Sequence, residues 1–255
     1  MNNSSIFSLK GRTALITGSS RGIGAALAIE LARAGADVVV HCVANVDAAN
    51  HVCANIQALG SRAAQVQGDL RETDTIEQVA TNALAAFGRI DILIHNASIQ
   101  YRTHWLASTH EQAIEQFNAN LFAALRLAQR LTPPMIERGW GRILMIGSVQ
   151  QTVPHPEMAL YAASKAALEN LTRNLAKQLA PTGITVNNLA PGVIDTDRNK
   201  QALGDKTYLQ RVLEKIPANR VGKPEDCVGA ALMLCSNAAA YITGQTLYID
   251  GGMSL

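Results

Sequence analysis

The chain has 255 residues, of which 48% are hydrophobic and 16% are charged. This composition supports a sizeable buried core and excludes an intrinsically disordered chain. Lys and Arg number 22 against 20 Asp and Glu, and because no basic stripe accompanies this near balance, we expect no nucleic-acid partner.

Short runs rich in β-branched residues alternate with longer Ala- and Leu-rich segments along most of the chain. The runs predict strands at Thr13–Thr17, Asp37–Cys42, Ala63–Gln67, Ile90–His95, Arg142–Ser148, Ile184–Ala190 and Thr246–Asp250. The longer segments predict helices at Gly22–Ala34, Asp47–Leu59, Asp74–Phe87 (with Asp74 as its N-cap), Thr109–Glu137, Met158–Leu179 and Pro224–Ser236. This alternation is typical of an α/β fold. We expect a single doubly wound Rossmann-type domain over residues 1–255, with a central parallel sheet flanked by helices on both faces.

The first predicted strand is followed directly by the glycine-rich run TGSSRGIG, from Thr17 to Gly24. Glycines permit a tight turn here and let backbone N–H groups approach a pyrophosphate at the start of a helix. A glycine-rich turn alone also occurs in many loops without a ligand. Its place after the first strand of an alternating pattern favours a dinucleotide site.

The end of the second predicted strand bears on the choice of nucleotide. Sites that prefer NAD usually carry Asp or Glu there to bind the ribose hydroxyls, but no carboxylate stands between Val38 and Val46. Arg21, inside the glycine run, offers a planar fork of donors that suits a 2′-phosphate, although it also fits a solvated loop. The two features together predict NADP(H).

The run YAASKAALENL begins at Tyr161 and carries Lys165 four residues later. Residues four apart share one face of a helix, so the phenol and the ammonium lie side by side. A free tyrosine titrates near pH ~10, and a neighbouring positive charge favours its phenolate form. The pair therefore fits a proton carrier. Taken in isolation, the pair is explained better by a surface tyrosine packed on a lysine stem.

The segment Gly192–Lys223 is long and polar, follows a Pro-Gly pair and has weak sheet character. In a doubly wound fold it would pass over the carboxyl ends of the strands, where ligands bind. We interpret residues 192–223 as a substrate-binding excursion that acts as a lid; an incidental surface helix explains the composition equally well.

Cysteine and histidine spacing exclude two further classes of site. Cys42, Cys53, Cys227 and Cys235 form no C-x-x-C pair, which favours a reducing compartment. No histidines have a ligand spacing such as H-E-x-x-H, so we expect no catalytic metal. The N-terminal run MNNSSIFSLKG lacks the features of a signal peptide, and no apolar run approaches the ~18 residues of a membrane span. We expect a cytoplasmic protein without membrane contact.

Several motifs occur together in a fixed order: TGSSRGIG, HNAS at His95–Ser98, Asn120, Ser148, YAASK, and PGVIDT at Pro191–Thr196. Ser148 lies 13 residues before Tyr161, and Asn120 lies 28 before Ser148. In this order and spacing the chain resembles the short-chain dehydrogenase/reductase family, from about Leu9 to the terminal DGGMSL. The resemblance implies hydride transfer between NADP(H) and a small-molecule carbonyl or alcohol.

The resemblance, with the chemistry above, implies four catalytic residues. Tyr161 would be the general acid in reduction and the base in oxidation, and Lys165 would favour its phenolate and hold the nicotinamide ribose. Ser148 would donate a hydrogen bond to the substrate oxygen. Asn120 would anchor a water that links Lys165 to solvent.

The resemblance also implies a cofactor site. Asp69 would bind the adenine edge, Asn96 would brace the central strand, and Ile194 and Thr196 would contact the nicotinamide amide and the pyrophosphate. The family's Asn-Asn-Ala-Gly appears here as His95-Asn96-Ala97-Ser98, so Ser98 is expected to alter the pocket floor. The full expected set is Gly18, Ser20, Arg21, Gly22, Ile23, Gly24, Asp69, Leu70, Asn96, Ala97, Ser98, Tyr161, Lys165, Pro191, Gly192, Ile194 and Thr196.

Two substrate classes stay open. The pattern resembles 3-oxoacyl-acyl carrier protein reductases, but their basic docking positions hold Gly139 and Thr182 here, which argues against an acyl carrier protein partner even though Arg138 adjoins the first. NASIQYR, from Asn96 to Arg102, resembles gluconate 5-dehydrogenase-like reductases of keto-sugar acids. The candidate substrate-binding residues are Gln100, Arg102, Gln150 and His155; Arg102 and His155 would face a carboxylate or stand as solvated loop charges.

Two further expectations concern catalysis and assembly. A regulator that binds NADP(H) without catalysis is the alternative function, although it would need no intact Ser–Tyr–Lys set. The apolar residues of Thr109–Glu137 and Met158–Leu179 exceed the needs of one sheet face. With the family resemblance they imply a homotetramer, unless the apolar surplus packs within the monomer.

Overall fold

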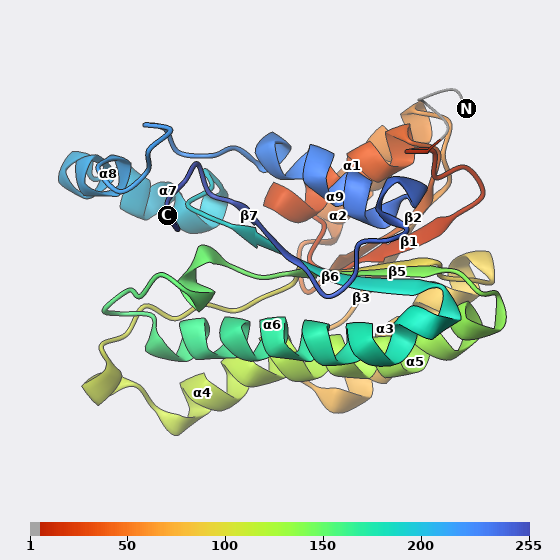
Figure 1. Cartoon of the computed structure of the whole chain (residues 1–255), viewed down its shortest axis with the longest axis horizontal. Helices are drawn as coiled ribbons and strands as arrows, with labels where there is room; N and C mark the ends of the chain where they lie inside the picture. The colour runs from red at the N-terminus through yellow and green to blue at the C-terminus, as the bar shows by residue number, and fades with distance from the viewer. Residues whose placement is uncertain (1–5) are drawn as a thin grey trace.

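Within residues 6–255, which the computed structural model describes, seven strands form one parallel sheet in the order β3-β2-β1-β4-β5-β6-β7 (Figure 1). All seven predicted strands are confirmed with ends shifted by at most a few residues. Residues 1–5, part of the segment in which we expect no signal peptide, lie outside the described residues. The strands are β1 (Thr13–Ile16), β2 (Asp37–Cys42), β3 (Ala63–Gln67), β4 (Ile92–His95), β5 (Gly141–Ile146), β6 (Ile184–Pro191) and β7 (Thr246–Ile249).

The order of the strands reverses at β1, which pairs in parallel with β2 on one side and with β4 on the other. The chain builds outward from β1 to β3, then crosses back to β4 and builds in the opposite direction. The connections after β1 and β4 therefore diverge. In open parallel sheets this point leaves a crevice at the carboxyl ends of the strands, and ligands bind there.

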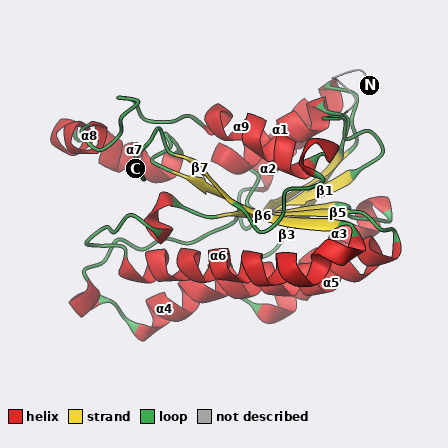
Figure 2. Cartoon of the chain, in the orientation of Figure 1, coloured by secondary structure: helices red, strands yellow, loops and turns green. Residues whose placement is uncertain are grey.

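Helices cover both faces of the sheet, as predicted for a doubly wound fold (Figures 1 and 2). The layer that packs in one core comprises α1 (Gly22–Arg33), α2 (Val46–Ala58) and α9 (Val228–Cys235). The layer on the opposite face comprises α3 (Thr73–Phe87), α5 (Ala123–Glu137) and α6 (Ala159–Leu179), with α4 (His110–Phe117) beside them.

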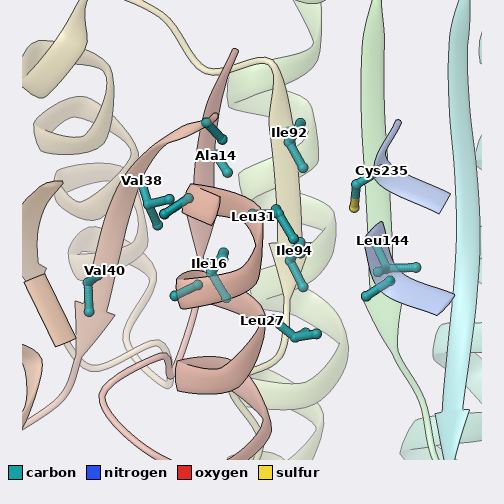
Figure 3. Close-up of a cluster of buried hydrophobic side chains, with 14 of the residues drawn as sticks. Ala14, Ile16, Leu27, Leu31, Val38, Val40, Ile92, Ile94, Leu144 and Cys235 are labelled. Carbon is teal, nitrogen blue, oxygen red and sulfur yellow. The ribbon is translucent and has the colours of Figure 1, made fainter. Parts of the chain in front are cut away.

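Strand β1 shows why the sequences of the central strands are continuously apolar. Ala14 and Ile16 point toward Leu27 and Leu31 of α1 (Figure 3), whereas Leu15 packs in the core of the opposite face. Alternate side chains of a strand face opposite sides, and both sides are buried here. Each such leucine or isoleucine contributes about 1.5–3 kcal/mol to folding through burial, so the central strands are fixed firmly.

The predicted helix Thr109–Glu137 is wrong as a single element. Thr109 caps α4 in a capping box with Gln112, and a π-helical turn, η2 (Asn118–Phe122), separates α4 from α5. In that turn the amide of Ala123 bonds to the carbonyl of Asn118 five residues earlier. Turns of this kind are rare and frequently occur at functional sites.

The starts of α2 (Val46) and α6 (Ala159) differ from the prediction by one residue, and those of α3 and of the segment at Pro224 differ in the cap and in the first turn, respectively. α3 begins at Thr73 after Glu72, so Asp74 is not the N-cap. Asp74 lies in the first turn, where its negative charge interacts favourably with the helix dipole and still stabilises the helix. The predicted helix from Pro224 begins as a 3₁₀ turn, η5 (Pro224–Cys227), before α9. Pro224 is nevertheless the first helical residue, as its fixed φ favours.

Residues 192–223 form α7 (Asp197–Leu203) and α8 (Lys206–Leu213), which lie close to the C-terminus in Figure 1. A bridge between Ile194 and Gly222 closes the base of the segment. The amide of Ala218 bonds to the carbonyl of Gly251 at 2.9 Å. The segment thus leaves the sheet after β6 and returns to it near the end of β7. Among residues 6–255 no helix combines the length and the hydropathy that a bilayer crossing needs.

Candidate active site

A cavity of about 700 Å³ lies at the carboxyl edge of the sheet and is walled on one side by the 192–223 segment. Most of the residues predicted for the site line it together. They are Gly18, Ser20, Arg21, Gly22, Ile23, Asp69, Leu70, Asn96, Ala97, Ser98, Gln100, Ser148, Gln150, His155, Tyr161, Lys165, Pro191, Gly192, Ile194 and Thr196. Gly24, Asn120 and Arg102 do not line the cavity, and each instead contacts residues that support it.

The glycine run forms a tight turn from β1 into α1. Gly18 and Gly22 have φ values of 62° and 56°, a conformation that side chains rarely adopt. A Cβ on Gly24 would lie 2.5 Å from both the carbonyl oxygen of Gly18 and Nδ2 of Asn96. The turn therefore needs glycine at these positions, and its backbone is left free to approach a ligand closely.

Asn96 braces the ends of β1 and β4, as expected. Its side-chain amide donates to the carbonyls of Thr17 and Gly18 at 2.9 and 3.0 Å. The hydroxyl of Thr17 in turn accepts the amides of Asn96 and Ala97 at 3.0 and 2.9 Å. These bonds fix the start of the glycine run against β4.

His95, which replaces the family's asparagine, is fully buried beneath the site. Its Nε2 lies 3.0 Å from the carbonyl oxygen of Ala119, which only accepts, so Nε2 carries the proton and Nδ1 faces the Thr17 hydroxyl at 3.4 Å. Burial, with a smaller effect of the Lys165 charge, lowers the pKa of His95 to about 3. The neutral ring links β4 to the π-helical turn.

The π-helical turn carries Asn120, whose side-chain oxygen and nitrogen are both hydrogen-bonded. Its Oδ1 accepts the amide of Ile99 at 2.8 Å, and its Nδ2 donates to the carbonyl of Ile99 and to Oγ of Ser164, both at 2.9 Å. Both amide hydrogens are used, and Oδ1 retains one lone pair for a further donor. Asn120 thus ties the loop after β4 to α6, beside Lys165.

Ser148 follows β5 and lines the cavity, and its hydroxyl oxygen already accepts one hydrogen bond. Its Oγ accepts the backbone amide of Gln150 at 3.2 Å and caps the short turn η3 (Val149–Gln151). Because that bond uses a lone pair, the hydroxyl hydrogen stays free to point at a ligand. Oε1 of Gln150 is itself buried without a hydrogen-bond partner among the described residues.

Tyr161 and Lys165 lie in the first two turns of α6 and both line the cavity. Lys165 is 1% exposed, and its Nζ donates to the carbonyl of Ile146 at 2.7 Å and lies 5.8 Å from the centre of the Tyr161 ring. Burial, followed by the charge of Arg198, lowers the pKa of Lys165 to about 7. The predicted side-by-side pair is present, and its ammonium is held by β5.

Asp69 lines the cavity from the loop after β3. Its carboxylate is paired with Arg71 at 2.6 Å and accepts the Arg71 backbone amide at 3.0 Å. These hydrogen bonds lower the pKa of Asp69 and keep it ionised. Arg71 also bonds Glu115 of α4 at 2.8 Å, so the loop after β3 is fixed to the next layer.

Sequence reasoning predicted Gly192, Ile194 and Thr196 of the excursion but missed the residues that α7 and α8 bring into the cavity. Arg198 of α7 donates to both Oγ and the carbonyl of Ser98, at 2.9 and 2.8 Å. Asp197 lies 3.9 Å from Arg21. Ser98 alone gave a signal, because a glycine in its place would offer no hydroxyl to Arg198. The other residues missed along the wall include Cys42, Val43, Ala44, Asn45, Asn199, Tyr208, Arg211, Val212, Lys215 and Met253.

Arg102 is held just outside the cavity. Its guanidinium donates to Oη of Tyr208 at 3.0 Å, approaches Nε2 of His155 at 3.3 Å and lies 3.7 Å from Glu157. Tyr208 and His155 line the cavity, whereas Arg102 does not. Arg102 therefore reaches the site through its neighbours, and it joins the loop after β4 to α8.

The geometry fits an extended dinucleotide better than a metal. Residues 6–255 contain no group of three or more His, Cys, Asp or Glu side chains that could hold a metal ion. The cavity instead runs from the open backbone of the glycine turn to Tyr161 and Lys165. A turn in which Cβ atoms cannot fit, followed by a helix start, suits a pyrophosphate.

Comparisons with known proteins agree with this geometry. The model of a family described as Enoyl-(Acyl carrier protein) reductase matches residues 18–254. The 7alpha-hydroxysteroid dehydrogenase of Escherichia coli is 38% identical over 252 residues, which cover 99% of this chain and 98% of that protein.

Two solved structures are similar over nearly their whole length. A 3-oxoacyl (acyl-carrier-protein) reductase from Agrobacterium tumefaciens with NADP bound has a TM-score of 0.94 and 40% identity, over 99% of this chain and 98% of that one. A gluconate 5-dehydrogenase from Burkholderia cenocepacia in complex with NADP and tartrate has a TM-score of 0.93 and 36% identity, over 99% of both chains.

Proposed function

The chain belongs to the short-chain dehydrogenase/reductase family, and on this premise we propose that it transfers a hydride between NADP(H) and a ketone or secondary alcohol. One observation carries the proposal: Ser148, Tyr161 and Lys165 line the same cavity as the glycine turn. A proton donor, an oxyanion-binding hydroxyl and a dinucleotide-binding turn therefore meet in one space, which is what carbonyl reduction requires.

Several features support NADP(H) as the cofactor. Arg21 lines the cavity beside residues 42–45, where the chain carries no carboxylate, and its guanidinium suits a 2′-phosphate. The two similar structures described above hold NADP. The glycine turn, Thr196 and Asp69 would hold the phosphates and the adenosine. When bound, the nicotinamide supplies or accepts the hydride.

Tyr161 and Ser148 would handle the substrate oxygen. As negative charge develops on that oxygen, the free hydroxyl hydrogen of Ser148 stabilises it, since Oγ already accepts from Gln150. The phenol of Tyr161 delivers the proton in reduction and takes it back in oxidation. Both side chains come from the carboxyl edge, Ser148 after β5 and Tyr161 from the first turn of α6.

Lys165 would support Tyr161 by its charge. A cation beside the phenol stabilises the phenolate that remains after proton transfer, and the carbonyl of Ile146 fixes the ammonium at 2.7 Å. The same ammonium would hold the nicotinamide ribose. Asn120 keeps one lone pair of Oδ1 for a water donor, which supports its role in carrying protons between Lys165 and solvent.

Residues 1–255 would act as one domain, with 192–223 as its lid. Arg198 and Asp197, at the start of α7, contact Ser98 and Arg21 across the cavity. Buried Ile194, Val212 and Ile216 anchor the segment, whereas its contacts across the cavity at the start of α7 are polar and exposed. Such contacts are weak individually, so they suit a segment that opens and closes.

The charges around the substrate end favour an anionic substrate. Three cations on the excursion side line the cavity: Arg198, Arg211 and Lys215. Of the two carboxylates that line it, Asp69 lies on the cofactor side and Asp197 is paired with Arg21. A keto acid of the sugar-acid type would meet these cations. A 3-oxoacyl thioester remains the second candidate, as the similar Agrobacterium structure suggests.

A spectrophotometric assay tests the proposal. Purified protein should oxidise NADPH, and more slowly NADH, when supplied with an activated diketone, and then distinguish keto-sugar acids from 3-oxoacyl thioesters and 7-oxosteroids in a panel. Binding of NADPH without turnover of any carbonyl in the panel would instead support the non-catalytic regulator. Absence of binding to either dinucleotide would contradict both functions.

We further infer that the protein is a homotetramer built on the α4–α5 and α6 faces. Ile114 of α4, Phe122 of the π-helical turn and Ile136 of α5 are each more than 40% exposed, which supports an apolar surface covered by a second copy. Size-exclusion chromatography with light scattering should give four times the chain mass. A monomer at all concentrations would contradict this inference.

A further inference from the structure

His41, the fifth residue of β2, is fully buried and bridges two loops that line the cavity. Its Nδ1 lies 2.9 Å from the backbone nitrogen of Gly18, and its Nε2 lies 3.0 Å from the carbonyl oxygen of Gly68. An amide N–H only donates and a carbonyl only accepts. The imidazole is therefore neutral with its proton on Nε2, and each ring nitrogen has the single partner that suits it.

The backbone of His41 binds the same turn. Its amide donates to Oγ of Ser19 at 3.1 Å, and its carbonyl accepts the amide of Ser19 at 2.9 Å. The hydroxyl of Ser19 passes its own hydrogen to the carbonyl of Ile16 at 2.7 Å. One residue of β2 thus fixes both Gly18 and Ser19, the first two residues after Thr17 in the glycine run.

The second partner, Gly68, directly precedes Asp69 and Leu70, which line the cavity. Gly18 lines the cavity as well. The ring of His41 therefore spans the space beneath the cavity between the loop after β1 and the loop after β3. A shift of either loop would break one of its two bonds.

We propose that His41 is a positioning residue that holds the Gly18 and Gly68 loops at the separation which the dinucleotide requires. This rests on the proposed function, because it assigns the glycine turn to the pyrophosphate and Asp69 to the adenine. The neutral ring is the form that the site demands, since a second ring proton would face the N–H of Gly18. Burial accordingly lowers the pKa of His41 to about 4.

Only a side chain with an acceptor and a donor at imidazole spacing satisfies both loops. Asparagine places an amide oxygen close to the position of Nδ1, and glutamine places an amide nitrogen close to that of Nε2. His41→Asn should therefore keep the bond to Gly18 and lose that to Gly68, and His41→Gln should do the reverse. His41→Leu loses both and leaves a buried N–H and a buried carbonyl unpaired.

The test compares these three variants with the wild type in NADPH titration, steady-state kinetics and thermal unfolding. The Kd and KM for NADPH should rise by at least about 10-fold in His41→Leu, while kcat at saturating NADPH stays within about threefold. The Asn and Gln variants should fall between Leu and wild type. His51→Asn and His51→Gln, at an exposed position on α2, are the matched controls and should bind normally.

The outcomes separate the possible failures. If the His41→Leu variant folds and has the wild-type KM for NADPH, the proposal is overturned. A lower Tm in all three variants without any change in their KM for NADPH overturns it as well. If His41→Leu does not fold, the Asn and Gln variants decide, because each retains one bond and wild-type KM in both contradicts a positioning role. A wild-type protein that fails to bind NADPH overturns the proposed function itself.

Discussion

The ammonium of Lys165 donates a 2.7 Å hydrogen bond to the carbonyl of Ile146, the last residue of β5. The strand thereby holds the cation near the Tyr161 ring without any carboxylate in the bond. A buried cation without a carboxylate partner is costly, which is why burial lowers the pKa of Lys165 to about 7. Lys165 is thus easily deprotonated until a ligand supplies negative charge.

Binding of NADPH should therefore take up a proton at Lys165. With a pKa of about 7, only about one tenth of Lys165 is charged at pH 8, and the phosphates and ribose of the cofactor favour the charged form. Calorimetric titration at pH 8 in buffers of different ionisation enthalpy should report uptake approaching one proton. Lys165→Met should abolish it. Equal uptake in wild type and Lys165→Met would contradict this account of the site.

Tyr161→Phe should separate binding from chemistry. Removal of the phenol oxygen leaves the ring and its packing in place, so the Kd for NADPH should stay near the wild-type value. Loss of a positioned general acid should lower kcat by about 10²- to 10⁴-fold. Tyr241→Phe, at a fully exposed tyrosine, is the matched control. Carbonyl reduction within tenfold of wild type in Tyr161→Phe would contradict the assignment.

The strands and the shared helical face of the site follow from short-range rules. Strands buried on both sides read as apolar runs such as Asp37–Cys42, and the i, i+4 spacing of an α-helix puts Tyr161 and Lys165 on one face. Both patterns are local, so the sequence alone predicts them. The order of the strands follows from the alternation with helices and the right-handed crossover.

The features that sequence did not predict depend on contacts between distant residues. The π-helical turn is fastened by His95 and by the loop at Ile99, more than 20 residues from Asn120. The bond between Arg198 and Ser98 spans 100 residues. No periodicity within either segment encodes such bonds. Their only trace in the sequence is the pair of departures from the family pattern, His95 and Ser98.

Arg21→Ala should reduce the preference for NADPH over NADH. Charge-assisted hydrogen bonds contribute about 1.5–3 kcal/mol, so loss of the guanidinium should raise KM for NADPH by about 10- to 100-fold and leave KM for NADH nearly unchanged. The exposed pair with Asp197, at 3.9 Å, contributes little and should not obscure this effect. Arg33→Ala at the end of α1 is the control. An equal change for both cofactors would contradict a 2′-phosphate role.

Two glycine substitutions should have opposite effects on stability. In Gly24→Ala the new methyl would lie 2.5 Å from the Gly18 carbonyl, so the backbone must shift, at a cost of about 1–3 kcal/mol. In Gly229→Ala, within α9, no atom of residues 6–255 beyond the adjacent helical backbone lies within 4 Å of the new methyl, and the higher helix propensity of alanine should stabilise the fold by up to about 1 kcal/mol. Denaturant unfolding measures both. Stabilisation in Gly24→Ala would contradict the tight turn.

The two buried imidazoles should make the fold sensitive to acid. Both rings are neutral in the folded protein, with pKa values of about 4 for His41 and about 3 for His95, whose ring also faces the Lys165 charge. An unfolded histidine has a pKa near 6.5, so below that pH the unfolded state binds more protons. The two neutral rings therefore make their full contribution to the free energy of unfolding above about pH 7. This contribution is lost as the pH falls through 6.5 toward 4.

Each imidazole should contribute a slope of about 1.4 kcal/mol per pH unit in this range, on the order of 2 kcal/mol between pH 6.5 and pH 5. His95→Asn, which restores the family's residue, should remove one such slope from the free energy of unfolding whatever its stability at pH 7.5. His51→Asn, at an exposed position, should leave the slope unchanged. Denaturant titrations from pH 5 to pH 7.5 measure it, and an unaltered slope in His95→Asn would mean that this ring is charged in the folded protein.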